Sequence, residues 1–191
     1  MTPPLFGLVM AGGRSRRMGH DKATLRYRGM PHAEWTAQLL APYCERVFFS
    51  CRADQTIGDP HLVIRDREAD QGPMGGLLAA HEAHPNVAWF AVACDLPNLD
   101  DAGVRALTAA RSPDHLATMY VSLEEQPEPL CAVYEPTIFA ELIAAFAAGQ
   151  RCPRRVLANL GDRVRGVTPT DPRLLDNANT PQDAARHGSA P

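Results

Sequence analysis

Two adjacent glycines and a group of positive charges mark the stretch of this sequence best suited to chemistry. Gly12 and Gly13 follow an apolar run from Leu5 to Met10, and neither carries a Cβ atom that would keep a ligand from the backbone. Four cations occupy the next nine positions, namely Arg14, Arg16, Arg17 and Lys22. Because backbone N–H groups in such a turn can point at an anion, the stretch predicts a site for closely spaced negative oxygens, as in phosphates.

The glycine spacing excludes two common phosphate-binding motifs. A dinucleotide fingerprint requires G-x-G-x-x-G and a P-loop requires G-x-x-x-x-G-K-[ST]. Neither pattern occurs here, since Gly19 is followed by His20. A surface turn with solvated arginines is the simpler alternative. The combination of an apolar strand, paired glycines and four cations favours the phosphate site.

A second feature is the aspartate that ends the most apolar segment. Val87 to Cys94 predicts a central strand, and it stops at Asp95. A carboxylate at the carboxyl end of a central parallel strand lies in the ligand crevice and is free to hold Mg²⁺ together with substrate phosphates. The alternative is a turn or helix-capping aspartate before Pro97.

The remaining patterns predict the elements that position these groups. Further strands are expected at 46–51, 62–64 and 164–168, and helices at 33–44, 71–84, 104–110 and 138–146. Two apolar segments, ATMYVS and PLCAVYEP, flank the polar residues 124–128 and predict a strand pair. We expect this pair to add an antiparallel edge to an otherwise parallel sheet and to carry a site for a second substrate.

Three further motifs each leave two interpretations open. A glycine-rich turn opens the helix at 71–84 and predicts an anion or ribose site, or simply a flexible connection. Arg151, Arg154 and Arg155 form a second basic cluster that receives another phosphate or solvates a helix end. Asn177 and Asn179 offer the donors and acceptor that suit a heterocycle edge such as a pterin, or they serve a turn.

The composition predicts one domain over residues 1–191. The chain is 45% hydrophobic with a net charge of −3, which gives no global attraction to nucleic acid or an anionic membrane. No apolar stretch reaches the roughly 20 residues that span a bilayer, and the first apolar run lacks the charged flank of a signal peptide. We therefore expect a cytoplasmic protein. Five cysteines without a C-x-x-C pair indicate neither a zinc site nor a disulfide framework.

The motifs together resemble one known family. AGGRSRRMGHDK at 11–22 is similar to the loop A-G-G-x-S-x-R-M-G-x-D-K of the MobA-like nucleotidyltransferases. Four more motifs follow in the family's order: GPMGGL at 72–77, ACDLP at 93–97, PLCAVY at 129–134 and NANTPQD at 177–183. The likeness runs from Leu5 to about Arg186, and agreement of five separated motifs is far more specific than any one of them.

The resemblance implies a Rossmann-like three-layer α/β/α sandwich with a mostly parallel sheet and a small antiparallel excursion. It implies an enzyme that transfers GMP from GTP to molybdenum-bound molybdopterin, with Mg²⁺ as cofactor and pyrophosphate as the second product. It also implies that Asp95 binds Mg²⁺ and that Asn177 and Asn179 face the molybdopterin. The other binding positions carried over are Met10, Ala11, Gly12, Gly13, Lys22, Ser50, Asp66 and Gly76.

Three departures from the family pattern involve four positions. The family often has Leu at Met10, which is a volume-conserving difference, and commonly has Asn near Ser50, so an amide is missing there. It has Pro-Leu where His32 and Ala33 stand. Among relatives, A-G-G in the first loop is typical of GTP users and A-A-G of cytidylyl-transferring enzymes, so Gly12 and Gly13 favour guanine.

In the mechanism that this resemblance implies, Lys22 holds the phosphates of GTP, Asp95 holds the metal and Arg17 stabilises the developing negative charge. Expected partners are the two substrates and, transiently, molybdenum-insertion proteins or apo-molybdoenzymes. A related transferase that uses CTP or activates a sugar phosphate is one alternative. A non-catalytic carrier of the finished cofactor is another, although it does not require Lys22 or Asp95.

Overall fold

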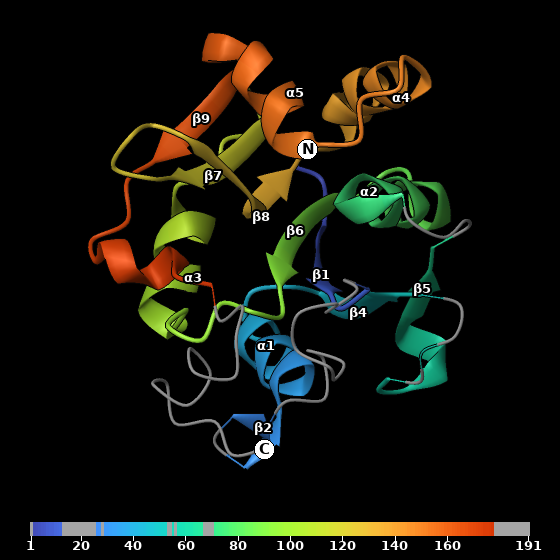
Figure 1. Cartoon of the computed structure of the whole chain (residues 1–191), viewed down its shortest axis with the longest axis vertical. Helices are drawn as coiled ribbons and strands as arrows, with labels where there is room; N and C mark the ends of the chain where they lie inside the picture. The colour runs from blue at the N-terminus through green and yellow to red at the C-terminus, as the bar shows by residue number, and fades with distance from the viewer. Residues whose placement is uncertain are drawn as a thin grey trace.

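The computed structural model describes residues 2–12, 26–27, 29–52, 55, 57–66 and 71–177. Within them a seven-stranded sheet has the order β5-β4-β1-β6-β8-β7-β9, and β2 pairs separately with β3 (Figure 1). The strands of the large sheet are β1 Leu5–Met10, β4 Arg46–Cys51, β5 Val63–Arg65, β6 Ala88–Ala93, β7 Ala117–Val121, β8 Pro127–Tyr134 and β9 Val164–Val167. The small pair is β2 Arg26–Tyr27 and β3 Met30–Pro31. The helices are α1 His32–Leu40, α2 Gly72–Ala83, α3 Asp101–Ala109, α4 Phe139–Ala147 and α5 Pro153–Asn159.

The first half of the sheet is parallel, as the apolar runs predicted. β1 pairs in parallel with β4 on one side and β6 on the other, and β4 pairs in parallel with β5. All six residues of β6 are buried, which is typical of a parallel strand covered on both faces. β6 is the middle strand of the seven, so the prediction of a central strand that ends just before Asp95 is confirmed.

The antiparallel strand lies inside the sheet, and its predicted place at the edge was wrong. β8 runs antiparallel to both of its neighbours, β6 and β7, while β9 pairs in parallel with β7 and forms the edge. Burial explains this order. The last four residues of β8 are buried, whereas β9 has no buried residue and tolerates exposure on one side.

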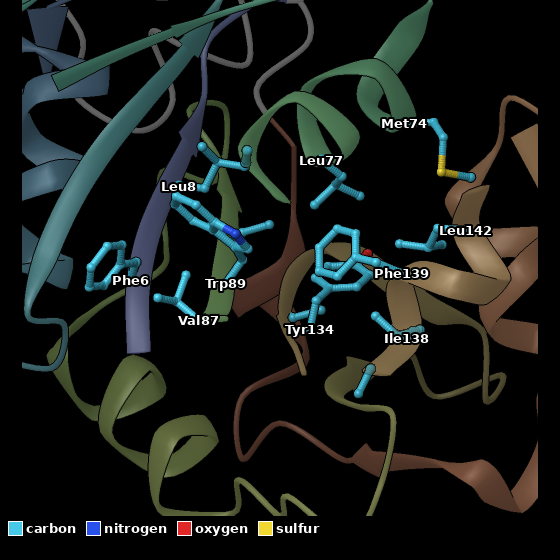
Figure 2. Close-up of a cluster of buried hydrophobic side chains, with 14 of the residues drawn as sticks. Phe6, Leu8, Met74, Leu77, Val87, Trp89, Tyr134, Ile138, Phe139 and Leu142 are labelled. Atoms are coloured by element: carbon cyan, nitrogen blue, oxygen red, sulfur yellow. The ribbon is translucent and has the colours of Figure 1, made fainter. Parts of the chain in front are cut away.

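Helices cover both faces of the sheet in three layers (Figure 1). Alternate residues of β6 enter the two cores, because successive side chains of a strand point to opposite faces. Trp89 packs with α2, α4 and α5, and Phe90 packs with α1 and α3. Figure 2 shows side chains of the first of these cores, among them Leu77 of α2, Phe139 and Leu142 of α4, and Leu8 and Trp89 of β1 and β6. The expected α/β sandwich is therefore confirmed.

Local signals explain where several helices begin. Asp100, which with Asp101 is one of two sequence candidates for the cap of this helix, caps α3 by accepting a hydrogen bond of 2.8 Å from the Gly103 N–H. The helix predicted at 33–44 ends at Leu40, two residues before Pro42. α5 was missed because it is only seven residues long, and Pro153 begins it. None of the helices in the described part of the chain is both long and apolar enough to cross a membrane.

Candidate active site

The carboxyl ends of β1, β4 and β5 bring together residues that lie far apart in the sequence. Ala11 N–H donates to the Ser50 carbonyl at 2.8 Å, and Asp66 N–H donates to the Cys51 carbonyl at 3.0 Å. The Ser50 hydroxyl, which is buried, donates to Asp66 Oδ1 at 3.4 Å. These contacts join three of the predicted nucleotide-binding positions at one edge of the sheet, where open α/β sheets bind ligands.

The space around two predicted glycines is small, and at Gly76 it excludes any side chain. A Cβ atom on Gly76 would lie 2.3 Å from Ser50 Oγ and 2.9 Å from Met10 Cε. A Cβ atom on Gly12 would lie 3.2 Å from Asp66 Oδ2. The N-terminal part of α2 therefore packs directly against the ends of β1 and β4. We call Met10, Gly12, Ser50, Asp66 and Gly76 the glycine-lined group.

Asp66 is the only carboxylate among these five residues. Burial raises its pKa above the ordinary value, while the Ser50 hydrogen bond and the positive charge of Arg52 act in the opposite direction. An acceptor-only group in such a position can bind hydroxyl or N–H donors of a ligand.

Two residues that were not predicted hold the backbone at Ala11 and Gly12. Gln55 Nε2 donates to the Ala11 carbonyl at 3.2 Å, and its Oε1 accepts from the Arg52 N–H at 2.9 Å. Arg52 Nη1 donates to the Gly12 carbonyl at 3.3 Å. Their position just after β4, at the ligand edge of the sheet, was the available signal, although nothing local in the sequence links them to residues 11 and 12.

Asp95 lies at the same edge, and a buried histidine packs beside it. Cys94 N–H donates to the Met10 carbonyl at 3.3 Å, which ties the exit of β6 to that of β1. The Nδ1 atom of His32 contacts the Cys94 carbonyl, and because a carbonyl only accepts, Nδ1 carries the proton. Burial lowers the pKa of His32, although its contact with Cys94 and the nearby charge of Asp95 oppose the shift. The departure from the family at His32 thus contacts the turn that leads into Asp95.

A cavity of about 590 Å³ opens between α2, the start of β8 and the segment that leads into α5. Its apolar walls are Pro73, Pro129, Leu130 and Pro153, and its polar walls include Glu128, Arg151, Arg154 and Asn177. The cavity is within the 300 to 1,000 Å³ range typical of small-molecule sites. It brings two cations of the second basic cluster together with one of the two predicted pterin-facing asparagines.

Glu128 was not predicted, yet it lines this cavity and lies near enough to Asp95 to be affected by its charge. Val92 of β6 pairs with Cys131 of β8, Asp95 follows β6 in the turn beyond this pair, and Glu128 precedes Cys131 on β8. Burial raises the pKa of Glu128, and the negative charge of Asp95 adds to that shift. In the sequence Glu128 stands out only as the last residue of the polar segment 124–128.

Four predicted site residues lie outside the described part of the chain: Gly13, Arg17, Lys22 and Asn179. The segment 181–186, whose proline after Thr180 predicts a short helix, lies outside it as well. Among the described residues, no group of three or more His, Cys, Asp or Glu side chains is arranged to hold a metal ion.

Comparison with known proteins identifies the family. The model of the MobA-like NTP transferase domain matches residues 7–164. The chain belongs to this nucleotidyltransferase family. The match includes the glycine-lined group, Asp95 and Glu128, so the geometry described above belongs to the family's own domain.

Individual relatives agree with this assignment. The chain is 39% identical, over 94% of its length, to a molybdenum cofactor biosynthesis bifunctional protein of Synechocystis, and it spans about half (52%) of that protein. It is 32% identical to a molybdenum cofactor guanylyltransferase of Pseudomonas aeruginosa, over 97% of this chain and 95% of the relative. The structure of molybdopterin-guanine dinucleotide biosynthesis protein A from Archaeoglobus fulgidus superposes with a TM-score of 0.73 at 23% identity, over 95% of this chain and 96% of that one.

Proposed function

We propose that this MobA-like transferase, acting as one domain over residues 1–191, transfers GMP from GTP to molybdenum-bound molybdopterin and releases pyrophosphate. The observation that carries the proposal is the arrangement around Asp95. The glycine-lined group lies at the same edge of the sheet on one side, and the cavity with Arg154 and Asn177 adjoins Glu128 on the other. A nucleotide and a phosphorylated heterocycle would then meet at one carboxylate.

The nucleotide site is assigned to the glycine-lined group and to residues 13–22, which follow Gly12 in the sequence. The absence of Cβ atoms at Gly12 and Gly76 lets Met10, Ser50 and Asp66 pack closely together at this edge of the sheet. Asp66 accepts from donors of the base or ribose. Gly13, Arg17 and Lys22 complete the site in this proposal, with Lys22 on the phosphates and Arg17 on the charge that develops at the α-phosphorus.

The donor set near Asp95 fits Mg²⁺. This ion is usually bound by one or two carboxylates together with substrate phosphates rather than by a cage made only of protein. Within the described part of the chain Asp95 offers such a carboxylate, and no cluster of three ligating side chains competes with it. When bound, Mg²⁺ neutralises charge on the phosphates of GTP.

The acceptor site is assigned to the cavity. Arg154 and Asn177 line it, and its proline-rich walls offer a flat apolar surface to a pterin ring. An oxygen of the terminal phosphate of molybdopterin attacks the α-phosphorus in line, while the bond from that phosphorus to the β-phosphate oxygen breaks. A phosphate monoester is already anionic at neutral pH, so the protein contributes positioning and charge neutralisation rather than a general base.

The direct test is to incubate the protein with Mg²⁺, molybdenum-loaded molybdopterin and GTP, CTP, ATP or UTP in turn, and to identify the dinucleotide by mass. We expect the guanine dinucleotide and pyrophosphate. A cytosine product would overturn the choice of base but leave the roles of Asp95 and Lys22 in place. Binding of the finished cofactor without pyrophosphate release would favour the carrier.

The variants Asp95→Ala and Lys22→Ala test the roles given to metal and phosphate binding. Each should lower turnover by on the order of 10²-fold or more, measured as pyrophosphate release at saturating GTP. Turnover within about tenfold of wild type in both variants, a difference of only about 1.4 kcal/mol in the barrier, would contradict the two assignments.

A further inference from the structure

The three cations of the second basic cluster have different surroundings. Only one of them, Arg154, is paired with a carboxylate that also lines the cavity. Arg151 stacks its guanidinium on the Phe146 ring at 3.7 Å and donates to the Phe146 carbonyl at 2.5 Å. Arg155 does not line the cavity. Arg154 Nη2, in contrast, donates to Glu128 Oε2 at 3.2 Å, and both residues line the cavity.

The carboxylate of Glu128 is itself held in place. Its Oε1 accepts from the Leu130 N–H of β8 at 3.2 Å. Only 13% of the Glu128 side chain is exposed, against 48% of that of Arg154, so the carboxylate lies deeper than the guanidinium. A carboxylate fixed by the backbone of a sheet strand can therefore fix the direction of an arginine that reaches it from α5.

The buried carboxylate of Glu128 is unexpected beside a site for a phosphate, because both groups are negatively charged. Burial and the charge of Asp95 both disfavour its ionised form and raise the pKa of Glu128, and a bare carboxylate repels a phosphate. Arg154 can offset the repulsion between the Glu128 carboxylate and a phosphate, because a guanidinium presents five N–H donors in a planar fork. One edge can bind Glu128 while the remaining donors face an anion in the cavity.

We propose that Glu128 is a positioning residue that orients Arg154 toward the phosphate of the acceptor substrate. The assignment rests on the proposed function, since it takes the cavity as the site of a phosphorylated pterin. Without Glu128 the arginine would regain the rotamer freedom that the ion pair removes, and ordering it again would cost affinity for the phosphate. Contacts to the ring would be unaffected.

The test compares two ligands, 6-hydroxymethylpterin phosphate and 6-hydroxymethylpterin, by fluorescence titration in the absence of GTP. For wild type the phosphorylated ligand should bind more tightly. Glu128→Ala should weaken binding of the phosphorylated ligand by about tenfold and leave the other unchanged. Glu128→Gln keeps a hydrogen-bond acceptor for Arg154, so its loss should be smaller.

A double-mutant cycle separates this inference from the proposed function. Arg154→Ala should weaken binding of the phosphorylated ligand at least as much as Glu128→Ala does. The double variant should bind this ligand no more weakly than Arg154→Ala alone. The exposed pair of Arg163 and Glu141, joined at 2.9 Å, provides the matched control, and Glu141→Ala should change neither affinity.

Three outcomes would overturn the inference in distinguishable ways. If Arg154→Ala bound the phosphorylated ligand normally, the cavity would not be the acceptor site, which would count against the proposed function. Weak binding by Arg154→Ala with normal binding by Glu128→Ala would reject only the positioning role. Equal weakening of both ligands by Glu128→Ala would assign Glu128 to the fold of the cavity or to the ring instead.

Discussion

Close packing around Gly76 makes single residues decisive at the nucleotide site. The Cβ that alanine would add there meets Ser50 Oγ and Met10 Cε at distances that real Cβ atoms do not adopt. Ser50 in turn donates to Asp66. A change at any one of these residues therefore acts on the others, and the site is sensitive to the size of a side chain as well as to its charge.

Gly76→Ala should destabilise the fold by about 1 to 3 kcal/mol, the usual cost of overpacking, and should weaken GTP binding. Ser50→Ala removes the oxygen nearest to the added Cβ. The double variant should therefore recover part of the lost stability, measured by chemical denaturation. Strict additivity of the two single changes would show that the Gly76 and Ser50 positions do not meet.

The carboxyl group of Asp66 gives a prediction with a definite sign. Its folded pKa is raised by burial, so the folded state holds this proton to a higher pH than the unfolded chain does. Stability is therefore lost as pH rises through the folded pKa. Asp66→Asn escapes this loss and should be more stable than wild type at pH 7, with the advantage shrinking toward pH 4. A constant difference between the two proteins across that range would contradict the shift.

At the scale of elements, the packing of α2 against α4 includes an imidazole in an apolar setting. His81 of α2 stacks on Phe139 of α4 with ring centroids 4.0 Å apart and planes within 4°. Burial lowers the pKa of His81. The interface between these helices therefore favours the neutral ring.

Acid should weaken this interface. The unfolded chain binds a proton at His81 near the ordinary pKa of 6.5, whereas the folded chain binds it only at lower pH, so stability falls as pH drops below about 6.5. His81→Phe keeps a flat ring and removes the titration. The stability of this variant relative to wild type should rise between pH 7 and pH 5 in denaturation experiments, and a flat difference would contradict the prediction.

At the scale of the whole molecule, one ion pair joins segments from three parts of the chain. Arg111, just after α3, contacts Glu135, just after β8, through Nε at 2.6 Å and Nη2 at 2.9 Å. Its Nη2 also donates to the Pro3 carbonyl at 2.9 Å. Only 11% and 2% of the two side chains are exposed, so each charge depends on the other.

Arg111→Ala should lower the free energy of unfolding by about 3 to 5 kcal/mol, because it leaves the Glu135 carboxylate buried without its main partner. The exposed pair of Arg105 and Asp101 is the control, and Arg105→Ala should cost no more than about 0.5 kcal/mol. Urea denaturation measures the loss of unfolding free energy in both variants. Similar losses in the two variants would mean that burial of the Arg111 pair has no energetic consequence.

Much of the architecture was predictable from local patterns. An apolar run such as Leu5–Met10 or Ala88–Ala93 forms a strand because burial on both faces selects for it, and Asp100 caps α3 through atoms within three residues. The crowding at Gly12 and Gly76 agrees with the motifs that contain them. The positions given to Lys22 and Asn179 stay predictions.

What only the tertiary structure decided are the pairings between distant segments. The interior position of β8 and the contacts of Gln55 with Ala11, His32 with Cys94 and Glu128 with Arg154 have no local signature. Within one helix or strand, hydrogen bonds and burial repeat every few residues. They therefore leave a periodic pattern of apolar residues that can be recognised in the sequence. Which strand ends meet depends on how the whole sheet and its two helical layers pack, and that packing brings Glu128 within reach of the charge of Asp95.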